Sequence, residues 1–354
     1  MVDDATGAGD SRPPGVAAHP DAQLGEVGGA TRAGASFAGA SSARSGGQYL
    51  LAMLFPTMER ARFPVTRDQA MLLMAATNEI FLGIDIFFAH QISGSIVGDE
   101  WIPIIFGPVA GALLLAAGLV ARRRRDIATV FANVVFVASI VVGLLGAYFH
   151  LRYALLPSAP MGERANVDLL VWAPPILGPL TFCLVGLVGL SAAWLEDPPD
   201  SGALVLLRGW RLRLPYSKTR AYLFMVGMGS LATVISSVLD HARTGFQDPR
   251  LWLPTAVGVF ATVVSIGLGA LDRPTRRDLR VYFVAMLLMI AVGLGGAWLH
   301  VSTDLGTTGT VVLERFIRGA PFMAPLLFAD IGAIGLLALM APTEVGAAGP
   351  GAHR

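Results

Sequence analysis

The stretch "GLLGAYFHL" (143–151) occurs a second time, in closely similar form, as "GLGGAWLHV" (293–301). In both copies two glycines precede a histidine at the same spacing, within sequence that is otherwise apolar. An ionisable ring is costly in such surroundings, so a repeated histidine there is a functional candidate. The repetition also predicts that the chain contains two related parts.

The composition is that of a membrane protein. Of the 354 residues, 54% are hydrophobic and 14% are charged, whereas soluble domains carry about a quarter charged residues. The net charge of +1 and the lack of a basic patch argue against a nucleic-acid partner. The single cysteine, Cys183, excludes a disulfide framework and a CxxC motif. A lipid bilayer is therefore the expected environment.

Eight apolar segments are long enough to cross a membrane as helices. The loops on one side of them hold sixteen lysine and arginine residues, and the loops on the other side hold six. The positive-inside rule then predicts a multi-pass protein of the plasma or inner membrane with both termini in the cytoplasm. The segments are 70–91, 101–121, 127–153, 169–195, 220–242, 252–271, 279–301 and 319–341.

Two further sequence matches show how the repeat is organised. "HQISGSIVGDEWIP" begins at His90 and "HARTGFQDPRLWLP" at His241; both read HxxxG, six residues, then WxP. "PLTFCLVGLVGL" from Pro179 matches "PLLFADIGAIGL" from Pro325 at six of twelve positions. We therefore expect an all-α polytopic membrane protein of eight transmembrane helices, arranged as two tandem four-helix bundles. Four crossings are an even number, so both bundles have the same orientation.

The composition also predicts the domain boundaries. The first 48 residues are rich in Gly, Ala, Ser and Asp and lack apolar periodicity, which is typical of disorder. The apolar stretch that follows is too short to span a bilayer and is expected at its interface. The predicted parts are a disordered cytoplasmic tail (1–48), an interfacial segment (49–66), repeat 1 (67–197), a cytoplasmic linker (198–216), repeat 2 (217–342) and a second disordered tail (343–354).

Four histidines close the first, third, fifth and seventh segments, so all are expected at similar depth near the extracytoplasmic face. Alternate helices of a four-helix bundle commonly face each other across its core, where cofactor sites are built. Two imidazoles at one level would suit the axial positions of haem b. They would equally suit a copper or zinc ion. The expected pairs are His90 with His150 and His241 with His300.

Glycines lie four and seven residues before His150 and His300, and so on the same face of each helix. They could leave room for a flat cofactor such as haem, or they could allow close packing between helices. Basic side chains two residues beyond a histidine could neutralise haem propionates at the membrane edge. These candidates are Gly143, Gly146, Gly293, Gly296, Arg152 and Arg243.

The first repeat alone carries acids in the middle of its first segment. Glu79 lies eleven residues before His90, about three helical turns, and so shares its face. Asp85 lies on a different face, and the positions equivalent to both acids are serines in the second repeat. An ionisable group at mid-membrane depth is a candidate for proton handling or catalysis. The alternative is a neutral acid bonded to a backbone carbonyl.

Two tandem four-helix bundles, each with one extracytoplasmic histidine pair, resemble the layout of the haem A synthases. The resemblance covers the eight segments at the level of helix layout and histidine spacing. It implies haem bound between paired histidines. The motifs differ, because here the histidines close odd-numbered segments and Cys183 has no second cysteine to form that family's paired-cysteine loop.

Three functional hypotheses follow from these patterns. The first is a membrane haem protein with bis-histidine pairs that transfers electrons or modifies a redox cofactor. Because all four histidines lie on one side, its partner would be a quinol or an extracytoplasmic redox protein. The second is a non-haem copper or zinc protein using the four histidines. The third is a transporter or structural membrane protein in which the histidines are incidental.

Overall fold

The computed structural model describes residues 50–57, 63–92, 94, 96–121, 123–155, 159–164, 171–206, 209–306 and 311–342. The predictions for the tails 1–48 and 343–354 fall outside these residues.

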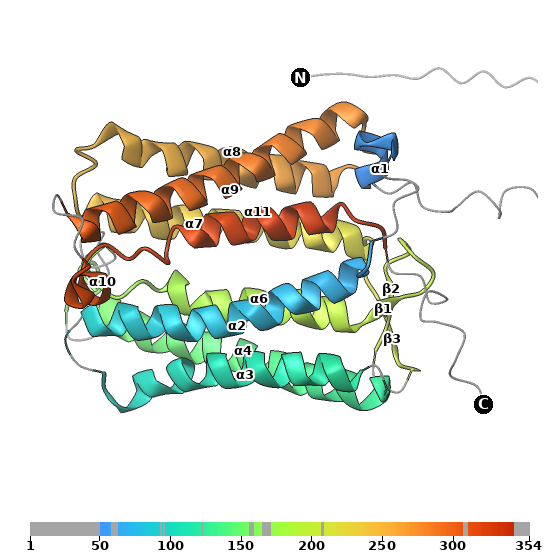
Figure 1. Ribbon diagram of the computed structural model, residues 1–354, viewed down its shortest axis with the longest axis horizontal. Coiled ribbons are helices and arrows are strands. Elements are labelled where there is room, and N and C mark those ends of the chain that lie inside the picture. Colours follow the sequence, from blue (N-terminus) through green and yellow to red (C-terminus); the bar gives the residue numbers. More distant parts are fainter. Residues whose placement is uncertain are drawn as a thin grey trace, which may run out of the picture. The chain divides into compact units, whose positions relative to one another are not determined.

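Six helices in this part of the chain are long and apolar enough to cross a membrane, which makes the protein a multi-pass membrane protein. Figure 1 shows these helices running side by side. Two of them begin at predictable caps: Ser217 accepts a hydrogen bond from the backbone of Arg220, and Thr275 forms a capping box with Asp278. The helices are α2 (Arg67–Ile92), α3 (Trp101–Val120), α4 (Arg125–Ala154), α7 (Lys218–Ala242), α8 (Trp252–Ala270) and α9 (Arg276–Leu305).

The fourth and eighth apolar segments form shorter helices than expected. Helix α6 (Leu177–Ala193) has 17 residues and α11 (Leu326–Ala338) has 13, so six helices, rather than eight, reach spanning length. Each short helix is preceded by prolines, Pro174 and Pro175 in one case and Pro321 and Pro325 in the other. Proline has no N–H group to donate within a helix. The prolines therefore turn part of each segment into irregular backbone.

Several short helical elements lie outside the long helices in the described part of the chain. Helix α1 (Leu50–Leu54) packs on α9, where Phe55 meets Phe283 edge to face at 5.4 Å, and the N–H of Leu51 donates to the carbonyl of Leu339 at 3.0 Å. The expected interfacial segment is thus attached to the second half of the chain. The others are α10 (Leu313–Arg318) and the 3₁₀ turns η2 (Gly98–Glu100) and η4 (Pro249–Leu251).

The connection between the halves contains a small antiparallel sheet, which the sequence patterns did not predict. Its strands are β1 (Leu195–Glu196), β2 (Ala203–Val205) and β3 (Arg211–Arg213), in the order β1-β2-β3. Leu204 pairs with Leu212 in the second ladder. Strands this short give little alternation to detect, so a helical protein can hold such a sheet without a clear sequence signal.

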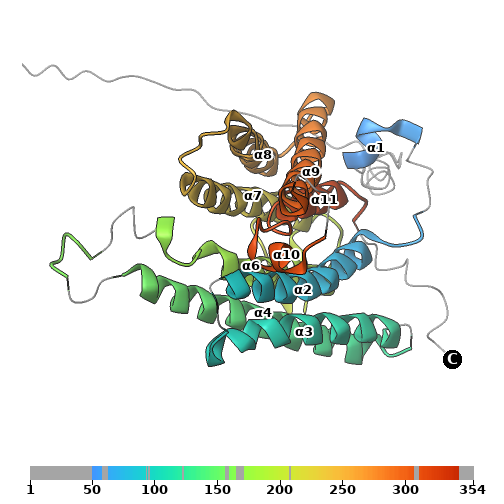
Figure 2. The ribbon, with the colours of Figure 1, turned by 60° about the vertical axis from the view of Figure 1, so that its left-hand side comes forward.

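The long helices pack in two groups with the same internal pattern (Figure 2). In the first group, α2 packs on α3 and α6, and α4 packs on α3 and α6. In the second, α7 packs on α8 and α11, and α9 packs on α8 and α11. The groups meet where α2 contacts α11 and where α6 contacts α7. In each group, the two helices that end in histidines are therefore diagonal partners.

Candidate functional site

The histidines gather at one end of the helix groups, where α2, α4, α7 and α9 approach their last turns; we call this the histidine end. The rings of His90 and His150 lie with their centroids 6.1 Å apart, at 59° to one another. His90 and His150 are 60 residues apart in the sequence. They belong to α2 and α4, which are diagonal partners in the first group. The structure therefore brings together the pair that the spacing indicated.

Three of the four histidines have their Nδ1 atom bonded to a main-chain carbonyl. Nδ1 of His90 is 2.8 Å from the carbonyl oxygen of Ile86 in the preceding turn. His150 reaches Pro175 at 2.8 Å, and His300 reaches Pro321 at 3.0 Å. A carbonyl only accepts, so each Nδ1 donates and Nε2 keeps its lone pair. Metal-ligating histidines are commonly oriented in this way.

The second histidine pair has a different setting. Nδ1 of His241 faces the hydroxyl of Ser237 at 3.3 Å, which can donate or accept. The ring of Phe246 lies 6.2 Å from that of His241 and stacks on Trp252 at 4.5 Å. The second pair therefore sits beside an aromatic stack.

A carboxylate that sequence reasoning missed lies beside the first pair. Oε1 of Glu100 is 3.8 Å from Nε2 of His90, and its charge also reaches His150. Oε2 of Glu100 accepts from the backbone N–H of Val97 at 2.9 Å, which fixes the side chain. The repeat offered a signal for this residue, because Leu251 stands at the equivalent position before the second WxP motif.

The glycines near the histidines are covered by the short helices. A methyl group added at Gly143 would lie 2.9 Å from the carbonyl oxygen of Pro179, and one at Gly146 would lie 2.7 Å from the Cβ of Pro179. A methyl group added at Gly293 would lie 2.9 Å from the carbonyl oxygen of Pro325, and one at Gly296 would lie 2.9 Å from the Cβ of Pro325. These glycines therefore allow α4 and α9 to approach α6 and α11. Close packing between helices, rather than room for a cofactor, accounts for these four glycines. Their faces leave no open space for a flat group.

The two candidate arginines have other partners. Arg243 donates to the carbonyl oxygens of Val171 at 2.8 Å and Ala173 at 3.2 Å, which attaches the end of α7 to the segment before α6. Arg152 is exposed and lies over the ring of Tyr148 at 5.9 Å. Neither contact brings an arginine to a histidine.

Glu79 is fully buried within the first helix group, at 0% exposure. Ser139 of α4 lies beside its carboxyl group, but that hydroxyl donates to the carbonyl of Phe182 at 2.9 Å. Neither carboxyl oxygen of Glu79 has a hydrogen-bond partner among the described residues. Helix α3 carries no ionisable side chain and α6 carries only Cys183. The carboxyl group therefore sits without a counter-charge in the helix core.

Asp85 belongs to a different environment. It lies near Asp240 of α7 and lines a cavity of about 20 Å³ between α2 and the residues around α10, including Phe88 and Phe322. A space of this size holds about one water molecule. Asp85 and Glu79 therefore do not form one catalytic group.

A buried cluster of charges lies at the opposite end of the helices, which we call the basic end. The only lysine of the chain, Lys218, is 0% exposed, and its Nζ donates to Asp68 at 2.8 Å and to the carbonyl of Trp194 at 2.6 Å. Arg67, 1% exposed, donates to Thr219 at 2.7 Å. Sequence reasoning missed this cluster, although a lone lysine at the start of an apolar helix was a usable signal.

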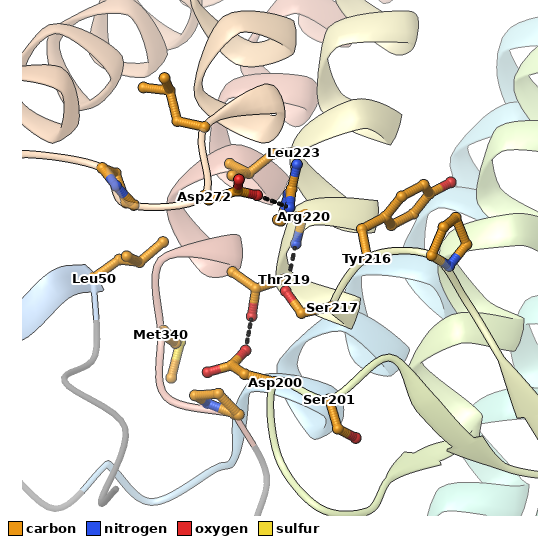
Figure 3. Close-up of a pocket in the computed structure, with 14 residues that line it drawn as sticks. Leu50, Asp200, Ser201, Tyr216, Ser217, Thr219, Arg220, Leu223, Asp272 and Met340 are labelled. Atoms are coloured by element: carbon orange, nitrogen blue, oxygen red, sulfur yellow. Dashed lines mark hydrogen bonds and ion pairs between the residues drawn. The ribbon is translucent and has the colours of Figure 1, made fainter. Parts of the chain in front are cut away.

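A cavity of about 400 Å³ lies next to this cluster (Figure 3). Its polar groups are largely bonded to one another: Thr219 donates to Asp200 at 3.0 Å, and Arg220 pairs with Asp272 at 2.7 Å. Leu50 of α1 and Met340 after α11 close its apolar side. The cavity therefore lies where the segment that links the two helix groups meets α7 and the end of α11.

In the part of the chain that the structure describes, no three His, Cys, Asp or Glu side chains are placed to hold one metal ion. The four described histidines therefore do not form one metal centre. No protein-family model, curated protein or solved structure matches the chain.

Proposed function

We propose that the protein consists of two related four-helix units of the same orientation, with its basic end and both termini on the cytoplasmic side of the plasma or inner membrane. Equivalent contacts support this proposal. His150 bonds Pro175 as His300 bonds Pro321, and each proline belongs to the irregular segment before a short helix. The two helix groups also share one packing pattern.

We propose that the first unit binds haem b between His90 and His150 and that the protein is an electron carrier at the extracytoplasmic side. The observation that carries this proposal is the 6.1 Å between the two ring centroids. Two imidazoles bound to one metal atom from opposite sides would have about this centroid separation, because each metal–nitrogen bond is about 2 Å long and each ring centroid lies about 1 Å beyond its nitrogen. Bound haem would supply one-electron redox chemistry at this place.

The residues of this chain have defined tasks in that function. The carbonyls of Ile86 and Pro175 hold the Nδ1 protons, so the Nε2 atoms of His90 and His150 stay available as ligands. The side chain of His90 is 16% exposed, so the surrounding helices cover most but not all of it. A quinol or an extracytoplasmic redox protein would be the exchange partner, because the pair lies at the end of the helices rather than at mid-depth.

We also propose His241 and His300 as a second haem site, on the ground of their equivalent positions in the sequence repeat. His300 is oriented by the carbonyl of Pro321 as His150 is by that of Pro175. His241 is held less strictly, since a hydroxyl can either accept its Nδ1 proton or donate to it. The second pair would thus bind haem with the ring of His241 less firmly oriented.

The visible spectrum of the detergent-purified full-length protein tests this function. Expression with ample haem should give a Soret band and a reduced α-band, and His150→Ala should remove about half of the absorbance and His300→Ala the other half. His353→Ala, in the C-terminal tail, is the matched control and should change nothing. A colourless preparation would overturn the haem proposal, and stoichiometric copper or zinc in it would favour a two-histidine metal site.

A further inference from the structure

We propose that the cavity at the basic end binds an ammonium group joined to an apolar body, and that Asp200 holds the ammonium. The site lies at the opposite end of the helices from the histidine pairs, so its occupation does not depend on haem binding. Three features support the proposal: the size of the cavity, the division of its wall into an apolar and an acidic part, and the contacts of Asp200.

The cavity is large enough for a small molecule. Its volume is about 400 Å³, within the roughly 300–1,000 Å³ that is typical of ligand pockets. One part of its wall is apolar and is formed by Leu50 of α1, Leu223 of α7, Leu271 after α8 and Met340 after α11. A bare inorganic ion would leave this apolar part without a contact, whereas an apolar group would fill it.

The charged groups of the wall leave one net negative charge. They are two carboxylates, Asp200 and Asp272, and one guanidinium group, that of Arg220 (Figure 3). Arg220 pairs with Asp272 at 2.7 Å and donates to the carbonyl oxygen of Gly269 at 2.7 Å, so its charge is already matched. Asp200 carries the excess charge, which favours a cationic ligand over an anionic one.

Asp200 is held in position by the connection and by α7. Its Oδ1 accepts from the hydroxyl of Thr219 at 3.0 Å, and it forms no ion pair with a basic side chain in the described part of the chain. Its backbone has a φ of 58°, a left-handed conformation that is uncommon for residues other than glycine and that occurs preferentially at functional sites. Because the residue is exposed, its carboxylate can accept charge-assisted hydrogen bonds from an ammonium group.

The repeat shows that these charges are not needed for the helix framework. In the first unit Gln69 occupies the position of Arg220 and forms a capping box with Thr66 at the start of α2. Ala121 occupies the position of Asp272. An uncharged cap and an alanine thus serve the equivalent helix ends. The charges of the cavity are specific to the second unit, which favours a binding role over a purely structural one.

An ammonium group with an apolar body could reach the cavity from two sources. One is the headgroup of an ethanolamine phospholipid, because the cavity lies at the ends of the spanning helices beside α1. The other is a free amine in the cytoplasm, where the proposed orientation places the basic end. Both sources present the same group to Asp200.

Two binding measurements on the detergent-purified full-length protein distinguish these sources. Calorimetric titration with phenethylamine tests the free amine, and phenethyl alcohol is the uncharged comparison. Native mass spectrometry with phosphatidylethanolamine tests the lipid, and phosphatidylcholine, whose quaternary ammonium has no N–H donor, is the comparison. At least one of the two primary amines should bind in preference to its comparison compound. The amine that does so identifies the source.

Asp200→Asn should weaken this binding about tenfold, because the amide oxygen can still accept from Thr219 but the charge is lost. Asparagine tolerates the left-handed conformation, so thermal unfolding should be unchanged. The matched control is Asp197→Asn, since Asp197 belongs to the same connection but pairs with Arg211; this variant should bind as the wild type does.

Three results would overturn the proposal. The first is that neither amine binds, and the second is that each amine binds no better than its comparison compound. The third is that Asp200→Asn binds as tightly as the wild type or loses no more affinity than Asp197→Asn. None of these results bears on the histidine pairs, so the haem proposal would stand or fall by its own spectrum.

Discussion

Arg67 and Lys218 each bond to the residue that follows the other. Nη1 of Arg67 donates to Thr219 at 2.7 Å, and Nζ of Lys218 donates to Asp68 at 2.8 Å. The two basic residues are 151 positions apart, the same separation as His90 and His241. Reciprocal contacts of this kind arise when two equivalent surfaces meet about a two-fold axis. The exchange therefore supports the proposal of two related units.

Removing the ammonium group of this cluster should destabilise the protein strongly. Lys218→Met leaves Asp68 buried without its main counter-charge, which costs about 3–5 kcal/mol in comparable cases. Thermal unfolding of the purified protein in detergent measures the loss. The control is Arg211→Met, which breaks the exposed pair with Asp197 and should cost less than about 1 kcal/mol. Equal losses in the two variants would contradict the structure.

The residues that form the contact between α2 and α11 should be replaceable by those at the corresponding contact between α7 and α6. Nδ2 of Asn78 donates to Asp330 at 2.8 Å, and at the equivalent positions Gly229 lies against Leu184. Asn78→Gly and Asp330→Leu should each destabilise, because each leaves one polar group without a partner.

The double variant Asn78→Gly/Asp330→Leu recreates the pair of the other interface and should recover part of the loss. The coupling energy expected for residues in contact is about 0.5–3 kcal/mol, obtained from a double-mutant cycle of thermal unfolding. Strictly additive losses would mean that the two interfaces are not equivalent.

Gly143 should not tolerate a side chain. A methyl group there would meet both Pro179 and Cys183 of α6, so Gly143→Ala should separate α4 from α6 and cost about 1–3 kcal/mol. Gly118→Ala in α3 is the control, since no atom lies within 4 Å of its added methyl group. If Gly143→Ala were as stable as Gly118→Ala, the glycine would serve as open space rather than as a packing surface.

Replacing Glu79 with an apolar residue should make the protein more stable. Both its carboxyl oxygens are buried without a hydrogen-bond partner among the described residues, and Met has a similar size without polar oxygens. Glu79→Met should therefore stabilise the protein by about 1–3 kcal/mol. Ser230→Ala, at the equivalent buried position of the second unit, should stabilise it by less. A destabilised Glu79→Met variant would show that the carboxyl group has a partner after all.

Hydropathy located the long helices well, because a membrane span needs about 20 apolar residues whatever it packs against. The pairing of His90 with His150 was also predictable, because two parallel helices of one bundle bring their ends to the same level. In contrast, hydropathy could not show that α6 and α11 are short, since apolar residues around Pro175 and Pro321 score the same in irregular backbone.

The contacts that distinguish the two helix groups could not be predicted from sequence patterns. Glu100 precedes a helix in a polar turn, and only folding brings it to His90. The glycines at 143 and 146 suited either a cofactor or a packed helix, and the position of Pro179 decided between them. Lys218 was noticeable as the only lysine of the chain, but its burial could not be predicted, because a basic residue at a helix start normally faces water.

The hydrogen bond from Leu51 to Leu339 has a consequence for how the chain could be built. It brings the start of α1 to the end of α11, so the first and last described elements of the chain meet at one place. A circular permutant could link the start of α1 to the end of α11 and open the chain between β2 and β3. Such a chain would synthesise the α7–α11 unit first and keep every helix, both histidine pairs and the Arg67–Lys218 exchange in place.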